Sequence, residues 1–217
     1  MPEPFDAVLL DLYDTIVWSE WGKLRDLIAQ HLGLDTKLLT KAFQITRPLR
    51  GVGANPDAEG DMAQVLTAVG VDPEPMLVQE LVELERTELD RGVHLYDDVS
   101  PALRELRARG VKTALVSNCS HSTRPVVDRL GLEEAFDEVL LSYEVKAMKP
   151  EAPIYRMALE RLGGISPERG VFVDDQPDYC DGGAAIGLAT RLILRPNEDV
   201  PPDTDGHEVV TDLWPLL

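Results

Sequence analysis

The sequence predicts an α/β protein: a Rossmann-like parallel sheet flanked by helices, with a four-helix cap domain inserted after the first strand. Three observations support this fold class. Short, almost continuously apolar segments are typical of strands that are covered on both faces. Helical segments alternate with them, which favours right-handed βαβ units. One long helical interval then interrupts the alternation. The predicted strands are residues 7–10, 111–117, 138–142, 170–173 and 190–194.

The predicted helices between these strands carry recognisable end signals. Residues 100–110 have Ser100 at the expected N-cap, Pro101 at the first helical position and Gly110 at the end. Residues 122–132 and 151–164 follow the same logic. Such helices are expected to connect the parallel strands.

The interval after the first strand is predicted to hold four helices and no strand, at residues 18–32, 35–48, 57–70 and 74–91. Doubly wound sheets bind ligands beyond the carboxyl ends of their strands. An insertion that leaves from the end of the first strand is therefore expected to lie over that crevice as a lid. The expected domains are a core of residues 1–16 with 93–217 and a cap of residues 17–92.

The composition restricts the classes of partner. The net charge of −18 and the pI near 4.5 disfavour nucleic acid and anionic membranes as partners. The same negative field would repel a small anionic substrate as well, unless a local positive site or a metal ion overcomes it. No apolar run approaches the ~18 residues of a membrane span, and the N-terminus lacks the pattern of a signal peptide. Cys119 and Cys180 lack metal-site spacing, which favours buried thiols in a cytoplasmic protein. A monomer and a homodimer are equally compatible with the sequence.

Reactive polar side chains follow four of the predicted strands. In chain order they are Asp11, Ser117 with Asn118, Lys149, and Asp174 with Asp175. Each of them alone has a structural explanation, such as a helix cap or a turn. All of them at successive strand ends form a specific signal, because the carboxyl ends of parallel strands meet at one edge of a sheet.

This set of residues is chemically suited to the hydrolysis of a phosphate ester. A carboxylate nucleophile such as Asp11 splits a difficult hydrolysis into two displacements. The phosphoryl group is anionic, so its attack by a carboxylate requires a cation, and Mg²⁺ bound by carboxylates supplies one. Lys149 adds a fixed positive charge, while the Ser117 hydroxyl is suited to bind phosphoryl oxygens. Without a bound cation, a cluster of one lysine and three carboxylates would be electrostatically unfavourable.

Four segments resemble the haloacid dehalogenase-like hydrolase superfamily, in the subgroup with a C1-type cap: "LLDLYDT" (9–15), "VSN" (116–118), "MKPEAPIY" (148–155) and "VFVDD" (171–175). The resemblance covers essentially the whole chain. It implies that Asp11 is the nucleophile, that Ser117 binds the transferred group and that Lys149 steadies the charge. It also implies Mg²⁺ near Asp174 and Asp175. The expected ligands are Asp11, the Tyr13 carbonyl and Asp175, with Asp174 adjacent.

The resemblance implies a Mg²⁺-dependent phosphatase that acts on a small phosphorylated metabolite through an aspartyl-phosphate on Asp11. Tyr13 is a departure, because phosphatases of this superfamily have a second Asp there as general acid and base. Tyr13 is able to hold a water or donate a proton weakly. Asp14 is expected to point away from Asp11, because side chains alternate in an extended segment.

Two alternatives to the phosphatase remain open. The first is an L-2-haloacid dehalogenase, an enzyme that cleaves carbon–halogen bonds, because Tyr13 resembles the residue that these enzymes have at this position. The second is a catalytically degenerate binding protein. The pair Asp174 and Asp175 disfavours a dehalogenase, since two carboxylates without a metal would repel an anionic substrate. Ala152 and Tyr179 are smaller departures from the superfamily pattern. We predict that Tyr13 and Tyr179 both lie near the site and make its pocket less polar.

Further candidate substrate contacts are Thr15, Trp18, Arg47 and Arg50. Trp18 is either a pocket wall or packing between cap and core. Arg47 and Arg50 either clamp an anionic substrate or stabilise a helix end. His121 is either a general base or a loop residue at the rim.

Overall fold

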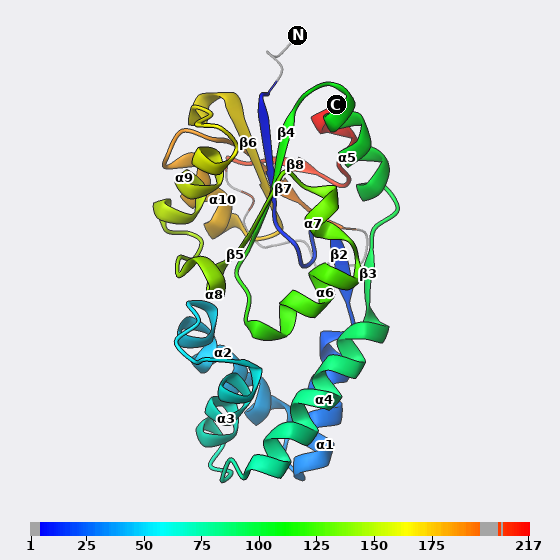
Figure 1. The fold of residues 1–217 in the computed structure, drawn as a ribbon, viewed down its shortest axis with the longest axis vertical. Helices are drawn as coiled ribbons and strands as arrows, with labels where there is room; N and C mark the ends of the chain where they lie inside the picture. The colour runs from blue at the N-terminus through cyan, green and yellow to red at the C-terminus, as the bar shows by residue number, and fades with distance from the viewer. Residues whose placement is uncertain (1–4, 196–203, 205) are drawn as a thin grey trace.

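The computed structural model describes residues 5–195, 204 and 206–217, and its centre is a six-stranded sheet (Figure 1). The strand order is β5-β4-β1-β6-β7-β8, and all neighbouring strands are parallel. This arrangement confirms the predicted Rossmann-like α/β fold. The strands are β1 (Ala7–Leu10), β4 (Lys112–Ser117), β5 (Glu138–Leu141), β6 (Gly170–Asp174), β7 (Ala189–Ile193) and β8 (Glu208–Val210).

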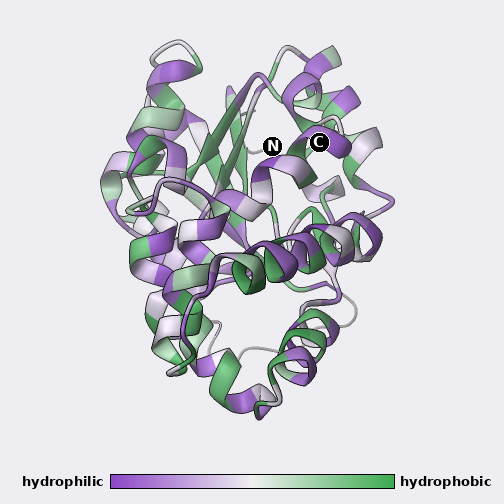
Figure 2. Cartoon of the chain, turned by 60° about the horizontal axis from the view of Figure 1, so that its bottom comes forward, coloured by the Kyte–Doolittle hydropathy of each residue, from purple (hydrophilic) through white to green (hydrophobic). Residues whose placement is uncertain are grey.

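Helices cover both faces of the sheet, which explains why the strands read as continuous apolar runs (Figure 2). Val8 and Leu10 of β1 belong to one apolar cluster, whereas Ala7 and Leu9 belong to the other. The first face is covered by α5 (Val99–Ala108), α6 (Arg124–Arg129) and α7 (Leu132–Ala135), and the second by α9 (Ala152–Arg161) and α10 (Pro177–Ala184). Shorter elements are α8 (Ser142–Val145), η1 (His121–Thr123), η2 (Pro167–Arg169) and η3 (Trp214–Leu216).

Details of the core differ from the predictions. Helix α5 begins at Val99, so Ser100 is not its N-cap. Asp98 occupies that position, and its carboxylate accepts hydrogen bonds from Arg195 at 3.0 Å and from the Leu213 amide at 2.8 Å. The predicted helix 122–132 is represented by η1 and α6, and α7 is separated from α6 because the chain turns at Gly131 with φ +65°. Strand β8 was not predicted.

Four helices separate β1 from the rest of the core: α1 (Trp21–Leu32), α2 (Thr36–Gly51), α3 (Ala58–Ala68) and α4 (Pro75–Gly92). Their number and order agree with the predicted helices. We refer to α1–α4 as the cap. In Figure 1 the cap lies beyond the carboxyl ends of the strands, the place at which parallel sheets bind ligands.

The cap is joined to the core through two paired strands, β2 (Val17–Ser19) and β3 (Val93–Leu95). They are antiparallel, with Trp18 opposite His94. The prediction that a helix begins near Trp18 and that this interval holds no strand is therefore wrong. The partner strand is remote in sequence, so no local pattern reveals the pairing that outweighs helix formation here.

None of the described helices combines the length and the apolar character needed to cross a membrane.

Candidate active site

The ends of the two central strands bring three carboxylates together. Asp11 directly follows β1, Asp174 is the last residue of its neighbour β6, and Asp175 follows Asp174. One oxygen of each carboxylate lies within 4.8 Å of the others. Asp11 and Asp174 are buried, whereas Asp175 is half-buried. The parallel register of β1 and β6 thus creates a dense group of negative charge.

Lys149 lies inside this group and is itself buried. Its Nζ donates to Asp11 Oδ1, and it donates to Asp174 Oδ2 at 2.6 Å. Burial lowers the pKa of Lys149, but the charges of Asp11 and Asp174 outweigh burial and hold this pKa above its ordinary value. Lys149 is thus a permanent cation between the two carboxylates.

The Asn118 amide holds the backbone of Lys149. Asn118 Nδ2 donates to the Lys149 carbonyl at 2.7 Å, and the Lys149 amide donates to Asn118 Oδ1 at 2.8 Å. This reciprocal pair links the loop after β4 to the loop after α8. Asn118 therefore fixes the position from which Lys149 reaches Asp11.

The three carboxylates carry more negative charge than Lys149 balances, and a divalent cation would balance the rest. Burial and then repulsion by Asp11 raise the pKa of Asp175 to about 7, and burial also raises the pKa of Asp174. Both Asp174 oxygens have partners, since Oδ2 accepts from Lys149 and Oδ1 accepts from the Gln176 amide at 2.8 Å. Asp11 and Asp175 are therefore the carboxylates best placed to bind a metal. An oxygen-only donor set of this kind suits Mg²⁺.

A cavity of about 340 Å³ lies between this group and the cap. Its core side includes Asp11, Ser117 and Asp175. Ser117 lines this side of the cavity although it is only 1% exposed. The cap side is lined by residues of α1, α2 and α4: Trp21, Leu24, Arg25, Phe43, Gln44, Arg47, Arg50, Gly51 and Glu85.

Tyr13 lines the cavity, and its hydroxyl lies 3.3 Å from Thr123 Oγ1. Burial raises the pKa of Tyr13 far above its ordinary value. Asp14 also lines the cavity, contrary to the expectation that it points away. The reason is that Asp14 has φ +58°, a left-handed conformation in which side chains no longer alternate as in a strand.

The second unusual tyrosine, Tyr179, lines the same cavity, and its ring centroid lies 5.1 Å from Lys149 Nζ. Both tyrosines are therefore in the region that the sequence predicted for them.

Cys119 and Cys180 are buried free thiols, and burial raises the pKa of Cys119 to about 12. A thiol with so high a pKa is a poor nucleophile at neutral pH.

Two candidate substrate contacts do not reach the cavity. Trp18 is 40% exposed and packs against His94, with ring centroids 4.6 Å apart. Trp21 lines the cavity instead, edge-on to Tyr13 at 5.2 Å. Thr15 is fully buried, and its carbonyl accepts a hydrogen bond from Arg195 at 2.6 Å. Thr15 therefore anchors the loop after β1 to the core.

Three arginines make the cap wall of the cavity positive. Arg47 and Arg50 lie there, together with Arg25, which was not predicted from the sequence. Arg50 is held by its own helix, since it donates to Thr46 Oγ1 at 3.0 Å and to the Phe43 carbonyl at 2.9 Å. Arg25 and Arg47 have no ion-pair partner among residues 5–195, 204 and 206–217. Burial and the charge of Arg47 lower the pKa of Arg25.

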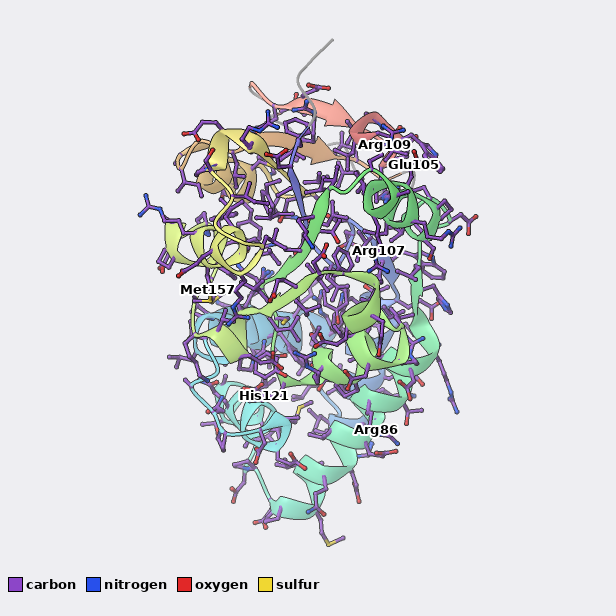
Figure 3. All side chains as sticks on the ribbon, turned by 45° about the horizontal axis from the view of Figure 1, so that its top comes forward. Arg86, Glu105, Arg107, Arg109, His121 and Met157 are labelled. Atoms are coloured by element: carbon purple, nitrogen blue, oxygen red, sulfur yellow. The ribbon has the colours of Figure 1, made fainter. Side chains whose placement is uncertain are left out.

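The cap also holds the loop that follows Ser117. His121 Nδ1 lies 2.8 Å from Asp61 Oδ2, and Figure 3 shows His121 where the core meets the cap helices. His121 does not line the cavity, which disagrees with a role as general base there. The hydroxyl of the next residue, Ser122, lies close enough to Glu85 of α4 to lower the pKa of that carboxyl. Glu85 was not predicted from the sequence either, because it reads as an ordinary charged position on a helix.

Known proteins with similar sequences are hydrolases. The family model described as haloacid dehalogenase-like hydrolase matches residues 5–187. A glyceraldehyde 3-phosphate phosphatase of Methanopyrus kandleri is 31% identical over 211 residues, which cover 92% of this chain and 88% of that protein. An (S)-2-haloacid dehalogenase of Pseudomonas fluorescens is 36% identical, but over only 50% of this chain and 48% of its own.

Among solved structures, a HAD phosphatase from Thermococcus onnurineus has a TM-score of 0.65 to this chain. It is 24% identical, and the alignment covers 97% of this chain and 95% of that one. This similarity shows that the fold is shared along nearly the whole chain.

Proposed function

This chain belongs to the haloacid dehalogenase-like hydrolase family, and we propose that it is a Mg²⁺-dependent phosphatase acting on a small phosphorylated metabolite. The observation that carries this proposal is the group of Asp11, Asp174 and Asp175 around one lysine. With only Lys149 as a counter-charge, the group repels any anionic substrate. A bound divalent cation removes that repulsion.

In the proposed reaction the Asp11 carboxylate attacks phosphorus and forms an aspartyl-phosphate, which water then hydrolyses. The Ser117 hydroxyl binds a phosphoryl oxygen, and Lys149 compensates charge on Asp11 and on the phosphoryl group. Asp11, Asp175 and the Tyr13 carbonyl would hold Mg²⁺, which supplies charge neutralisation when bound. Arg47 and Arg50 are proposed to attract the anionic substrate from the cap side, together with Arg25.

Carbon–halogen hydrolysis is the second candidate, because Tyr13 stands where the superfamily's phosphatases have a second Asp and because one relative is a haloacid dehalogenase. Halide leaves without a proton, so Tyr13 would need no acidic replacement. The carboxylate pair Asp174 and Asp175 favours the phosphatase. A binding protein without turnover would have no need for the buried contact of Lys149 with Asp11. A cytoplasmic location, and a monomeric or homodimeric state, stay predictions from the sequence.

Removal of the metal is expected to abolish phosphatase activity. Phosphate release from glyceraldehyde 3-phosphate is expected to fall at least ~100-fold in excess chelator and to return when Mg²⁺ is added, because Lys149 alone does not balance the charge of the three carboxylates. The measurement is the initial rate with and without chelator. Halide release from 2-chloropropionate is the parallel assay. Halide release that chelator leaves unchanged would support the dehalogenase and contradict the phosphatase.

Tyr13→Phe is expected to leave kcat within about 3-fold of the parent protein, because the raised pKa keeps this hydroxyl protonated and Thr123 is its partner. Loss of that hydrogen bond is expected to lower the free energy of unfolding by about 1 kcal/mol. Tyr155→Phe is the matched control, since the Tyr155 hydroxyl donates to the Tyr179 carbonyl at 2.7 Å. A 100-fold loss of kcat confined to Tyr13→Phe would show that its hydroxyl takes part in the reaction.

A further inference from the structure

The proposed phosphatase needs a proton donor that position 13 does not provide. An alkoxide leaving group has to be protonated as it departs, and Tyr13 is a weak acid whose hydroxyl contacts Thr123. In an in-line displacement the leaving oxygen lies on the side of phosphorus opposite the nucleophile. Asp11 attacks from the core, so the leaving oxygen faces the cap. The donor should therefore come from the cap wall of the cavity.

Glu85 is the carboxyl group in that position. It lies on α4, is 7% exposed and lines the same cavity as Asp11 and Ser117. Four described carboxyls line this cavity: Asp11, Asp14, Glu85 and Asp175. Glu85 alone among these four belongs to the cap. Asp14 lies on the loop of the nucleophile, and Asp11 and Asp175 belong to the group that would hold the metal.

The surroundings of Glu85 keep its proton available near neutral pH. Arg50 of α2, Asp61 of α3, Ser122 of η1 and Tyr13 on the loop after β1 are the groups that act on it. Burial raises the pKa of Glu85 to about 7, although the positive charge of Arg50 and the nearby Ser122 hydroxyl oppose this rise. A carboxyl in this range serves well both as an acid and as a base.

We propose that Glu85 is the general acid and base of this active site, an inference that rests on the proposed phosphatase function. In the first step the Asp11 oxygen bonds to phosphorus, the ester P–O bond breaks, and the Glu85 carboxyl gives its proton to the departing oxygen. In the second step the Glu85 carboxylate takes a proton from water as the water oxygen bonds to phosphorus. The bond from phosphorus to Asp11 then breaks, which releases phosphate, the Asp11 carboxylate and a reprotonated Glu85.

Glu85→Gln separates proton transfer from other roles when two substrates are compared. Glycerol 1-phosphate has an alkoxide leaving group, and its kcat is expected to fall by about 100- to 1,000-fold. p-Nitrophenyl phosphate has a leaving group that needs no proton. With it, the variant is expected to release a stoichiometric burst of nitrophenolate at a rate within about 3-fold of the parent protein. The slow step after the burst is hydrolysis of the aspartyl-phosphate, which lacks its base.

Glu88→Gln is the matched control on the same helix. Glu88 pairs with Lys23 at 3.2 Å and lies outside the cavity, so both substrates are expected to react at parent rates. An equal loss of the burst and of glycerol phosphate turnover in Glu85→Gln would show that Glu85 only holds Ser122 and Arg50 in place. Unchanged turnover of both esters in Glu85→Gln would overturn the proposal, as would an alkoxide-specific loss found only in Asp14→Asn.

A second variant tests whether the missing function is proton transfer. In Glu85→Gln combined with Tyr13→Asp, the new carboxyl is two residues after Asp11. The kcat for glycerol 1-phosphate is expected to be at least about 10-fold higher than in Glu85→Gln alone. No restoration, together with a lost burst, would contradict a proton-transfer role. A parent protein that hydrolyses neither ester with Mg²⁺ would instead overturn the proposed phosphatase function, so the two failures are distinguishable.

Discussion

Asp11→Asn is expected to lower kcat/KM for phosphate esters by at least about 10⁴-fold, because an amide oxygen is too weak a nucleophile to form the covalent intermediate. The variant keeps the size of the side chain, and it removes one of three mutually repelling carboxylates. We therefore expect a folded protein with an unfolding midpoint close to that of the parent. The measurement combines steady-state rates with mass spectrometry of the acid-quenched enzyme, which detects a phosphoryl group on the parent protein only.

Asp6→Asn is the control for this prediction. Asp6 lies just before β1, is exposed and pairs with Arg169 at 2.7 Å, so its loss is expected to leave the rate unchanged. Full activity in Asp11→Asn, or a phosphoryl group on another residue, would refute a mechanism based on Asp11.

Lys149→Met is expected to reduce both activity and stability. Its ammonium is the buried counter-charge of Asp11 and Asp174, and removal of one partner from such a cluster costs about 3–5 kcal/mol. In chelator, the free energy of unfolding is expected to fall by this amount. The kcat is expected to fall at least about 100-fold, because the charge at the nucleophile is no longer compensated.

The pH dependence of this stability loss has a definite sign. Burial already raises the pKa of Asp174 above its unfolded value, and loss of Lys149 raises it further. A carboxyl with a raised folded pKa destabilises the protein as pH increases above the unfolded pKa. Urea unfolding in chelator is therefore expected to show a larger difference between variant and parent at pH 8 than at pH 5, and Mg²⁺ is expected to reduce the difference at pH 8.

Lys112→Met is the matched control for Lys149→Met. Lys112 pairs with Asp137 at 2.8 Å on the surface, and its loss is expected to cost no more than about 1 kcal/mol at either pH. Equal effects of the two lysine variants would show that Lys149 is not an essential counter-charge.

The sequence predicts the core of the site because strand ends are local features. The apolar runs before Asp11 and Asp174 mark the ends of β1 and β6, and parallel pairing brings these ends together. The four cap helices are equally local, since their periodicity and loop signals lie within each segment.

The cap wall of the cavity could not be predicted in the same way. Arg25 and Glu85 read as ordinary charged positions on amphipathic helices, and only the packing of cap against core turns them toward the cavity. Trp21 rather than Trp18 lines the cavity because Trp18 belongs to β2, whose partner β3 is remote in the chain. The position of Asp14 depends on one left-handed backbone angle that no periodicity reports.

The pairing of β2 with β3 has a consequence for how such proteins diversify. The chain leaves the core at Val17–Ser19 and returns at Val93–Leu95, and these two crossings are hydrogen-bonded neighbours. The segment between them therefore starts and ends at almost one point, as a tolerated domain insertion does. Such a segment can be lengthened or replaced without a change in the six-stranded sheet, because β2 and β3 form a separate two-stranded sheet.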